Sequence, residues 1–256
     1  MTFQPDCGLT SRVHPAVNVE ERKGGLVPQL LILHYTGMPS AAKAIDWLCR
    51  AESRVSCHYV IDEAGIITQM VPERLRAWHA GVSRWQGEID VNSRSIGIEI
   101  QNPGHEHGYP DFPKAQMKAV IALSADIMSR YAMLPRNILA HSDVAPERKI
   151  DPGEKFSWKL LAQQGVGHWI KPSAIRPGEA GLGAGATDDN VRKAQTLLSR
   201  YGYDVAVTGE LDLKTTKLLR AFQLHFRPLQ ADGRLDHSTL RTLERLLSAF
   251  PAAGTV

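Results

Sequence analysis

Five short apolar runs in residues 26–170 have the length and composition of buried strands. They are Leu30–Tyr35, Cys57–Ile61, Ile66–Met70, Ser95–Ile100 and Asn137–Ala140. The second and third runs flank Asp62–Gly65, a segment typical of a hairpin turn. We therefore expect these two runs to pair as antiparallel strands.

Two stretches between these runs repeat apolar residues at helical spacing. The first occupies Ser40–Arg50, with the Ser40 hydroxyl as its cap. It places Ala44, Trp47 and Leu48 on one face. The second runs over Lys114–Tyr131. Because strands and helices are interleaved, the pattern predicts an α/β domain with a mixed central sheet flanked by helices.

Residues 188–250 repeat one turn signal between apolar helical stripes. The segment GELDLKT at Gly209–Thr215 is matched by GRLDHST at Gly233–Thr239. In both segments the glycine permits a turn with positive φ, and the aspartate can cap the helix that follows. The repeat predicts a small all-α domain of three helices. A helical tail with coincidental turns is the alternative.

Between these two regions the chain reads KPSAIRPGEAGLGAGAT, which is dominated by Gly, Ala and Pro. Such a stretch buries too little apolar surface to pack, which indicates an interdomain linker. The expected organisation is an N-terminal extension (1–25), a larger α/β domain (26–170), the linker (171–187) and the helical domain (188–250).

The composition is that of a folded chain. Of the 256 residues, 43% are hydrophobic and 22% are charged, which argues against disorder and against a coiled coil. No apolar run approaches the roughly 18 to 20 residues of a membrane span, so no transmembrane segment is expected. The formal net charge of +3 comes from scattered lysines and arginines, so we expect no nucleic-acid partner.

The cysteines and the first residues bear on the compartment. Three cysteines are too few for a disulfide scaffold. Cys49 and Cys57 are close enough in sequence to be bridged, although two buried thiols are the simpler expectation. Residues 1–7 lack a basic start followed by an apolar core, so they predict no signal peptide. A periplasmic or envelope location would need an export segment outside this sequence, and the cytoplasm is the alternative.

Three residues stand out as candidate metal ligands. His34 and His141 each lie at the end of a predicted strand, and Asp151 precedes Pro152 and Gly153. Two imidazoles and a carboxylate on restrained backbone would form a three-ligand zinc site with an open position for water. The spacing alone leaves a second interpretation open, in which Asp151 is a helix cap and the histidines are ordinary core or surface residues.

Residues 26–170 also carry six motifs in a fixed order. They are LHYT at 33–36, VSCHYVID at 55–62, AWHAG at 77–81, NSRSIGIE at 92–99, HSDVAP at 141–146 and RKIDPG at 148–153. With these motifs the region resembles the type-2 N-acetylmuramoyl-L-alanine amidases, whose fold is shared with peptidoglycan recognition proteins. Residues 188–248 resemble the helical peptidoglycan-binding module that is often fused to such enzymes.

The resemblance implies roles for individual residues. It assigns His34, His141 and Asp151 as the ligands of one zinc ion per chain. It implies that Glu99 moves protons and that Lys149 stabilises the developing oxyanion; on the sequence alone, both are also consistent with ordinary surface residues.

Other residues of these motifs also have expected roles. Tyr35, Trp78 and His79 are expected to contact substrate, with a structural role as the alternative for His79. We expect His58 to be a core histidine, and His105 and His107 to lie in a solvated loop. Two residues depart from the family pattern, Ala140 and Glu147, and both concern the shape of the loop beside the metal.

The expected function is zinc-dependent hydrolysis of the amide bond between N-acetylmuramic acid and L-alanine in peptidoglycan or muropeptides. The chain is expected to act as a monomer, with the helical domain binding the wall. Two alternatives remain: a peptidoglycan sensor that binds without cleaving, and a zinc peptidase that cuts within the stem peptide.

Overall fold

The computed structural model describes residues 3–248, which form eight strands and eight α-helices. The strands are β1 (Arg12–Val13), β2 (Val19–Glu21), β3 (Leu30–Tyr35), β4 (Tyr59–Ile61), β5 (Ile67–Gln69), β6 (Leu75–Ala77), β7 (Ser95–Ile100) and β8 (Ile138–Ala140). The helices are α1 (Ala41–Leu48), α2 (Val91–Arg94), α3 (Lys114–Arg130), α4 (His141–Val144), α5 (Trp158–Ala162), α6 (Asp189–Tyr201), α7 (Leu213–Phe226) and α8 (His237–Ser248). Residues 1–2 and 249–250, at the ends of the predicted N-terminal extension and helical domain, lie outside the described residues.

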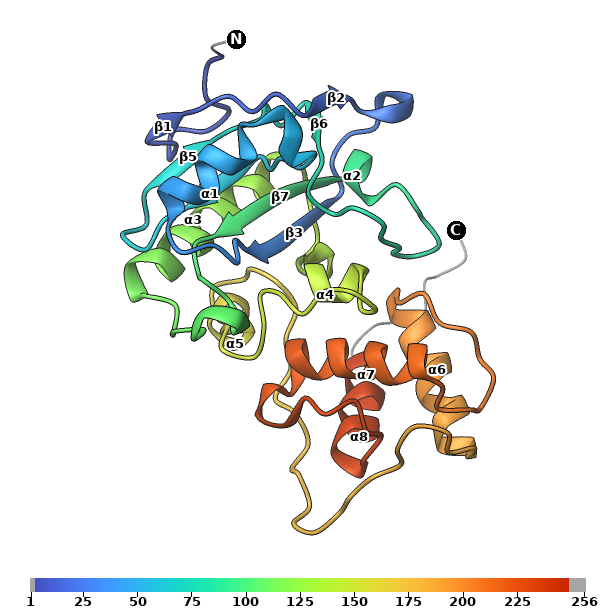
Figure 1. The fold of residues 1–256 in the computed structure, drawn as a ribbon. Helices are drawn as coiled ribbons and strands as arrows, with labels where there is room; N and C mark the ends of the chain where they lie inside the picture. Colours follow the sequence, from blue (N-terminus) through green and yellow to red (C-terminus); the bar gives the residue numbers. More distant parts are fainter. Residues whose placement is uncertain (1–2, 249–256) are drawn as a thin grey trace.

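Six of these strands form one mixed sheet in the order β1-β5-β4-β7-β3-β8 (Figure 1). Strand β3 lies between β7 and β8 and runs parallel to both. Strands β4 and β5 pair antiparallel, which confirms the expected hairpin. The register of β3 and β7 sets His34 opposite Glu99 near the carboxyl ends of both strands. The mixed sheet with flanking helices confirms the predicted fold class.

Alternation along β3 separates the two faces of the sheet. Leu31 and Leu33 belong to the buried cluster that includes the apolar stripe of α3. Leu30 and Ile32 face the other way, into a second buried cluster. His34 follows the same alternation, so it projects from the face opposite α3.

The N-terminal extension is part of the fold. Strand β1 adds to the edge of the sheet beside β5, and β2 pairs antiparallel with β6 in a separate ribbon. The sequence predicted none of these three short strands, because RV, VEE and LRA do not form apolar runs. Directly after β2 in the sequence, the buried Arg22 guanidinium donates hydrogen bonds to four backbone carbonyl oxygens, those of Glu73, Asn92, Ser93 and Ser95.

Helices α6, α7 and α8 form the predicted three-helix module. The Asp212 side chain accepts a hydrogen bond from Thr215 N (2.6 Å), and the Asp236 side chain accepts one from Thr239 N (2.7 Å). Both aspartates therefore cap the helices that the repeated turn signal assigned to them. This confirms the helical character of the region.

The Gly, Ala and Pro segment at 171–187 packs against this module, and the prediction that it cannot pack is wrong. Leu182 and Leu235 exchange backbone hydrogen bonds of 2.9 Å, and Ser173 N donates to Thr242 Oγ1 (3.0 Å). Backbone groups of the segment make these hydrogen bonds, which do not depend on apolar side chains, and its Leu182 and Ala186 pack against the hydrophobic cluster of the module. The proposed boundaries at residues 171 and 187 stay a prediction.

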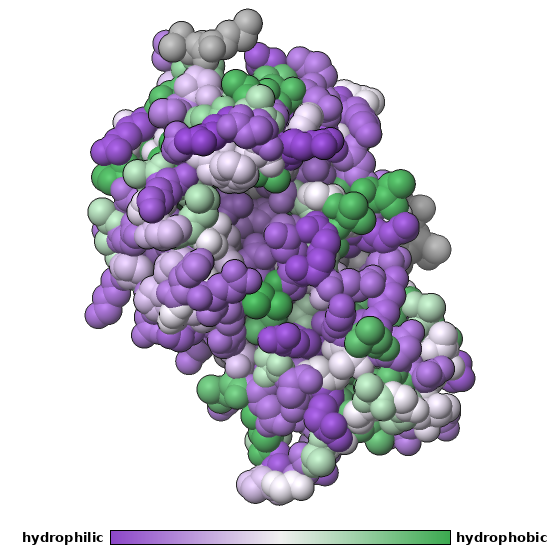
Figure 2. All heavy atoms as spheres, viewed as in Figure 1, coloured by the Kyte–Doolittle hydropathy of each residue, from purple (hydrophilic) through white to green (hydrophobic). Residues whose placement is uncertain are grey.

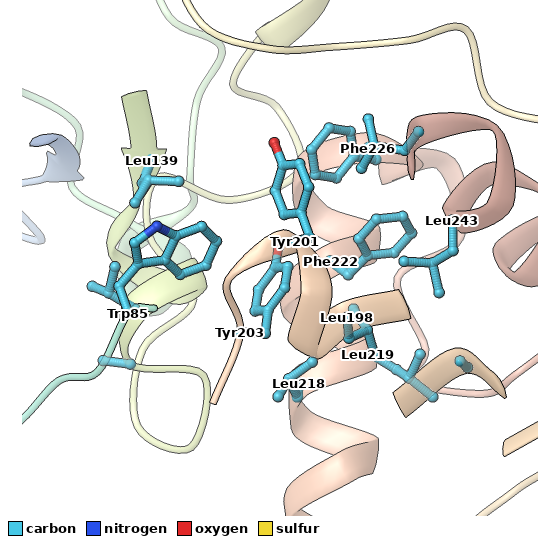
Figure 3. Packing of buried hydrophobic residues seen from close by; sticks show 14 of the residues in the cluster. Trp85, Leu139, Leu198, Tyr201, Tyr203, Leu218, Leu219, Phe222, Phe226 and Leu243 are labelled. Atoms are coloured by element: carbon cyan, nitrogen blue, oxygen red, sulfur yellow. The ribbon is translucent and has the colours of Figure 1, made fainter. Parts of the chain in front are cut away.

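The module shares one hydrophobic cluster with the sheet (Figure 3). Trp85 packs edge-on against Tyr203, with ring centroids 5.0 Å apart. Gln86 N donates to the carbonyl oxygen of Gly202 (2.8 Å). The same cluster joins Leu139 of β8 to Phe226 of α7. The two regions are therefore packed against each other over a continuous core.

The cysteines and the hydropathy of the helices bear on two of the expectations. All three cysteines are free; Cys57 is buried and Cys49 is half-buried. Burial raises the pKa of the Cys57 thiol well above its ordinary value. Within residues 3–248, no helix combines the length and hydropathy needed to cross a membrane.

Candidate metal centre

The fold brings the three candidate ligands together from separate elements. His34 comes from β3, His141 is the first residue of α4, and Asp151 lies in the loop that follows. His34 Nδ1 is 2.9 Å from His141 Nδ1 and 3.4 Å from Asp151 Oδ2. His141 Nδ1 is 3.0 Å from Asp151 Oδ2. All three side chains are buried, and their ligand atoms lie within 4.8 Å of one another.

A chain of hydrogen bonds orients His34. Its Nε2 lies 3.0 Å from His79 Nδ1, and His79 Nε2 lies 3.1 Å from Ser95 Oγ. The Ser95 hydroxyl donates to the carbonyl oxygen of Val91 (2.7 Å). Because a carbonyl oxygen only accepts, the Ser95 oxygen must accept from His79 Nε2, and His79 Nδ1 must accept from His34 Nε2. Every donor in this series of hydrogen bonds therefore points away from the candidate ligands. The Nδ1 lone pair of His34 therefore faces the other two candidate ligands.

His141 is oriented in the same sense. Its Nε2 lies 3.2 Å from the carbonyl oxygen of Ala80, so the proton belongs on Nε2 and the Nδ1 lone pair faces Asp151. Two imidazole lone pairs and a carboxylate oxygen thus converge on one point. These three electron-rich groups repel one another unless a cation lies between them.

The pKa shifts agree with this arrangement. Burial, together with the neighbouring His141, lowers the pKa of His34 to about 4. Burial alone would raise the pKa of Asp151, but in the metal-free cluster the adjacent His141 and His34, when they donate a proton to the carboxylate, outweigh burial and hold that pKa well below its ordinary value. Near neutral pH the site therefore presents a neutral His34 and an ionised Asp151, the forms that bind metals.

Two of the three candidate ligands, His141 and Asp151, line a cavity of about 540 Å³, and Glu99 is also among its lining residues. His34 is not in this lining, but its Nδ1 lies 2.9 Å from His141 Nδ1. Figure 2 shows a hollow lined by hydrophilic residues over the carboxyl ends of β3 and β7. Glu99 Oε2 is buried and has no hydrogen-bond partner among the described residues. Burial and the charge of Asp151 raise the Glu99 pKa well above its ordinary value, although Lys149 opposes the shift. Lys149 also lines the cavity.

The three residues predicted to contact substrate differ in their position relative to the cavity. Tyr35 lines the cavity, and its hydroxyl lies 3.1 Å from His105 Nδ1. His79 also borders the cavity, but both of its ring nitrogens are engaged by His34 and Ser95. Its ring packs against the backbone of Gly97 so closely that an added Cβ would come within 2.4 Å of it. This geometry favours the structural role for His79. Trp78 is not among the described residues that line the cavity.

One expectation about the surface histidines is wrong. His105 is not a solvated loop residue, because its Nε2 lies 3.0 Å from Glu154 Oε2 and its ring stacks on Tyr109 at 4.1 Å. The Gly-rich sequence around His105 gave no signal of Glu154, which comes from a segment 49 residues away, while Tyr109 belongs to the same loop. His107 is exposed, as expected.

His58 is a satisfied core histidine, as predicted. Gly97 N donates to its Nδ1 (3.0 Å), and its Nε2 lies 3.0 Å from the carbonyl oxygen of Leu75. The side chain is fully buried. Burial, with the nearby Arg22 guanidinium, lowers the pKa of His58 to about 3.

The buried neutral His58 makes folding sensitive to acid. Between pH 6.5 and about 3 the unfolded chain binds a proton that folded His58 excludes. The free energy of unfolding should therefore fall as the pH falls, by about 1.4 kcal/mol per pH unit for this one group. Urea unfolding of the zinc-free protein at several pH values from 7 to 4.5 checks this. The His58→Gln variant should show a shallower pH slope, and equal slopes would contradict the assignment.

The sequence did not identify one cavity residue, Trp47, as part of the site, although it placed Trp47 on the correct face of its helix. The spacing of Trp47 with Ala44 and Leu48 placed it on the apolar face of its helix. Trp47 is 41% exposed and lines the cavity. Ala44 and Leu48 border the same cavity, so the apolar face of α1 forms one of its walls. An indole on a face that is otherwise built from small and aliphatic residues is the signal that could have indicated this.

A histidine pair and an aspartate beside a buried carboxyl group, in an open cavity at the end of parallel strands, define a candidate metal-dependent hydrolase site. Comparison with known families agrees. A family model described as N-acetylmuramoyl-L-alanine amidase matches residues 24–154, and one described as a peptidoglycan binding domain matches residues 187–243.

Individual relatives extend the similarity over most of the chain. The N-acetylmuramoyl-L-alanine amidase AmiD of Escherichia coli is 36% identical over 236 residues, covering 87% of this chain and 83% of AmiD. The 1,6-anhydro-N-acetylmuramyl-L-alanine amidase AmpD of Citrobacter freundii is 35% identical over 148 residues, covering 51% of this chain and 77% of AmpD.

Solved structures show the same fold. AmiD from E. coli, in complex with the substrate anhydro-N-acetylmuramic acid-L-Ala-D-γ-Glu-L-Lys, superposes with a TM-score of 0.75 at 35% identity, covering 90% of this chain and 93% of AmiD. AmpDh3 from Pseudomonas aeruginosa gives a TM-score of 0.73 at 34% identity, covering 88% of this chain and 93% of AmpDh3. This chain belongs to the N-acetylmuramoyl-L-alanine amidase family, and it is an enzyme rather than a sensor that only binds.

Proposed function

We propose that the protein hydrolyses the amide bond between N-acetylmuramic acid and L-alanine in peptidoglycan or muropeptides, using one zinc ion held by His34, His141 and Asp151. The observation that carries the metal assignment is the convergence of two Nδ1 lone pairs and one carboxylate oxygen. Four-coordinate zinc at about 2.0–2.1 Å from its ligands places those ligands roughly 3.3 Å apart. The separations of 2.9, 3.0 and 3.4 Å in the cluster fit this requirement.

The substrate assignment is supported by the relatives. AmiD and AmpD are named for this amide bond, and the AmiD structure holds an anhydromuramoyl tripeptide. The cavity of about 540 Å³ offers polar groups on one wall and Trp47, Met38 and Val55 elsewhere in its lining. A cavity of this mixed character suits a ligand that joins a sugar to a peptide.

The chain's own residues supply the proton transfers. When bound, zinc lowers the pKa of water and polarises the substrate carbonyl. Glu99, whose pKa is raised and whose Oε2 is free of hydrogen bonds within the described residues, takes the proton from the attacking water and passes it to the departing amine of L-alanine. Lys149, on the cavity wall, places a positive charge near the oxygen that becomes negative.

We also propose that residues 188–250 bind the wall, since residues 187–243 match a peptidoglycan binding domain. Binding to sacculi with the active site inactivated tests this role separately from cleavage.

Mass spectrometry of digests tests the catalytic proposal. A soluble muropeptide of muramic acid with L-Ala, γ-D-Glu and L-Lys is incubated with the protein, with a chelator, and with added zinc after chelation. The expected product is the free peptide beginning with L-Ala, absent with the chelator and restored by zinc. Ordinary and 1,6-anhydro forms of the substrate measure which sugar is preferred. A cut inside the stem peptide, or cleavage that survives the chelator, contradicts the proposal.

The close packing of Gly97 against His79 gives a test of the proposed metal site. In a Gly97→Ala variant the new Cβ would overlap the His79 ring, so that His79 moves and His34 loses its Nε2 partner. Loss of such a partner typically weakens metal binding about 10- to 100-fold. Competition with a chromophoric chelator measures the change. Gly8→Ala is the control, because its added Cβ meets nothing within 4 Å. Unchanged zinc affinity in Gly97→Ala would contradict this role of His79.

A further inference from the structure

The helical module contacts the metal-site region through a buried polar cluster. Asp143 lies in α4, two residues after the proposed ligand His141. Tyr203, which follows α6, donates its hydroxyl proton to Asp143 Oδ1 (2.5 Å). His225 of α7 places Nδ1 at 2.7 Å from Asp143 Oδ2. Each of these side chains is at most 2% exposed.

Asp143 also fixes the turn that carries the ligand. Its Oδ2 accepts a hydrogen bond from Ala140 N (2.8 Å), directly before His141. Helix α4 has only four residues, so its own backbone hydrogen bonds contribute little to its stability. The Asp143 carboxylate is therefore an important tie between the end of β8 and the position of His141.

Within the described part of the chain, this carboxylate has three hydrogen-bonding partners, and two of them come from the module. Burying a carboxylate is energetically unfavourable unless hydrogen bonds compensate for the lost hydration. Without Tyr203 and His225, Asp143 would keep only the Ala140 amide and would move toward water. The turn beginning with His141 would then be free to shift.

The contacts of His225 are themselves well defined. Its ring lies between Trp158, at 3.7 Å between centroids, and Phe226, at 4.1 Å. Its Nε2 lies 3.2 Å from the carbonyl oxygen of His168. Trp158 and His168 lie outside the module, so His225 is held between the two regions.

From this geometry we propose that Tyr203 and His225 are positioning residues of the metal site, acting through Asp143 on His141. The proposal rests on the proposed zinc function and extends it. The module then has a second role besides wall binding: its docking sets how tightly the site holds zinc and how fast it turns over even a small substrate. A module that acted only as a wall anchor would affect neither property.

The test compares Tyr203→Phe and His225→Phe with the wild type. Tyr203→Phe removes one hydroxyl, and His225→Phe keeps an aromatic ring between Trp158 and Phe226. Tyr201→Phe is the matched control: it is another buried tyrosine of the module, and its hydroxyl lies 2.9 Å from His168 Nδ1. Thermal unfolding followed by circular dichroism confirms that each variant is folded.

Three quantities are measured: zinc affinity by chelator competition, and kcat and KM on a soluble muropeptide at saturating zinc. We expect zinc affinity to fall about 10-fold in Tyr203→Phe and up to about 100-fold in His225→Phe. We expect kcat to fall with KM little changed, and Tyr201→Phe to match the wild type. Should His225→Phe fail to fold, Tyr203→Phe decides alone.

The outcomes separate the two proposals. Zinc affinity and kcat within two-fold of wild type in the folded variants overturn the positioning role and leave the proposed function intact. A loss of the same size in Tyr201→Phe also overturns it, since the effect would then belong to module packing in general. A wild type that binds no zinc overturns the proposed function, and this inference with it.

Discussion

A His34→Ala variant should lose both zinc and hydrolysis. His34 is one of only three candidate ligands in the cluster, and its imidazole is fixed by His79 so that Nδ1 faces the other two. With one ligand removed, His141 and Asp151 alone cannot complete a three-ligand site. The loss of zinc affinity should exceed the about 10- to 100-fold typical of changes outside the ligand shell.

Zinc content by inductively coupled plasma mass spectrometry, and product release from a muropeptide, measure the two losses in His34→Ala. Asp151→Ala should behave in the same way. His107→Ala is the matched control, because it deletes an exposed imidazole in a nearby loop and should keep full zinc content and activity. A His34→Ala enzyme that holds one zinc and cleaves at the wild-type rate would remove the basis of the proposed mechanism.

The second large effect is expected for Glu99→Gln. Glutamine has nearly the same shape as glutamate but cannot take up a proton, so kcat should fall by about 10²- to 10⁴-fold. Zinc affinity should change little, because Glu99 is not among the three clustered ligands. KM should also stay near its wild-type value if Glu99 acts on the reacting atoms rather than on substrate binding.

Steady-state kinetics on a soluble muropeptide, with zinc content measured in parallel, separate proton transfer from metal binding. Glu63→Gln, at an exposed position in the hairpin turn, makes the same chemical change away from the cavity and is the control. If Glu99→Gln retains the wild-type kcat, another group must carry the proton. If it loses zinc, Glu99 belongs to the metal site instead.

The spacing of apolar residues and the turn-forming residues predicted those parts of the fold that depend on local sequence. The β4–β5 hairpin, strand β7 and helix α3 follow from apolar periodicity, and the caps Asp212 and Asp236 follow from the repeated turn signal. Strands β1, β2 and β6 were not predicted, since their existence depends on partners elsewhere in the chain.

In the candidate site, too, local sequence identified some residues, while contacts between distant segments could not be predicted. His34 and His141 could be selected because each ends an apolar run, and the resemblance added Glu99 and Lys149. The partners of His105 could not be predicted, nor could the link between Asp143 and His225, which are 82 residues apart in sequence. Contacts of this kind depend on how whole elements dock, which no local pattern encodes. The packing of residues 171–187 escaped prediction for a related reason, because backbone pairing leaves no trace in side-chain composition.

The shared core of sheet and helical module has a consequence for protein engineering. Wall-targeting modules are attractive parts for building chimaeric lysins, on the assumption that each unit folds and works alone. Here Trp85, Leu139 and Tyr203 lie in one hydrophobic cluster. Replacing the helical module with a foreign one would therefore expose apolar surface on the α/β domain. A hybrid made from this chain would need its junction placed by matching surfaces, rather than by cutting within residues 171–187.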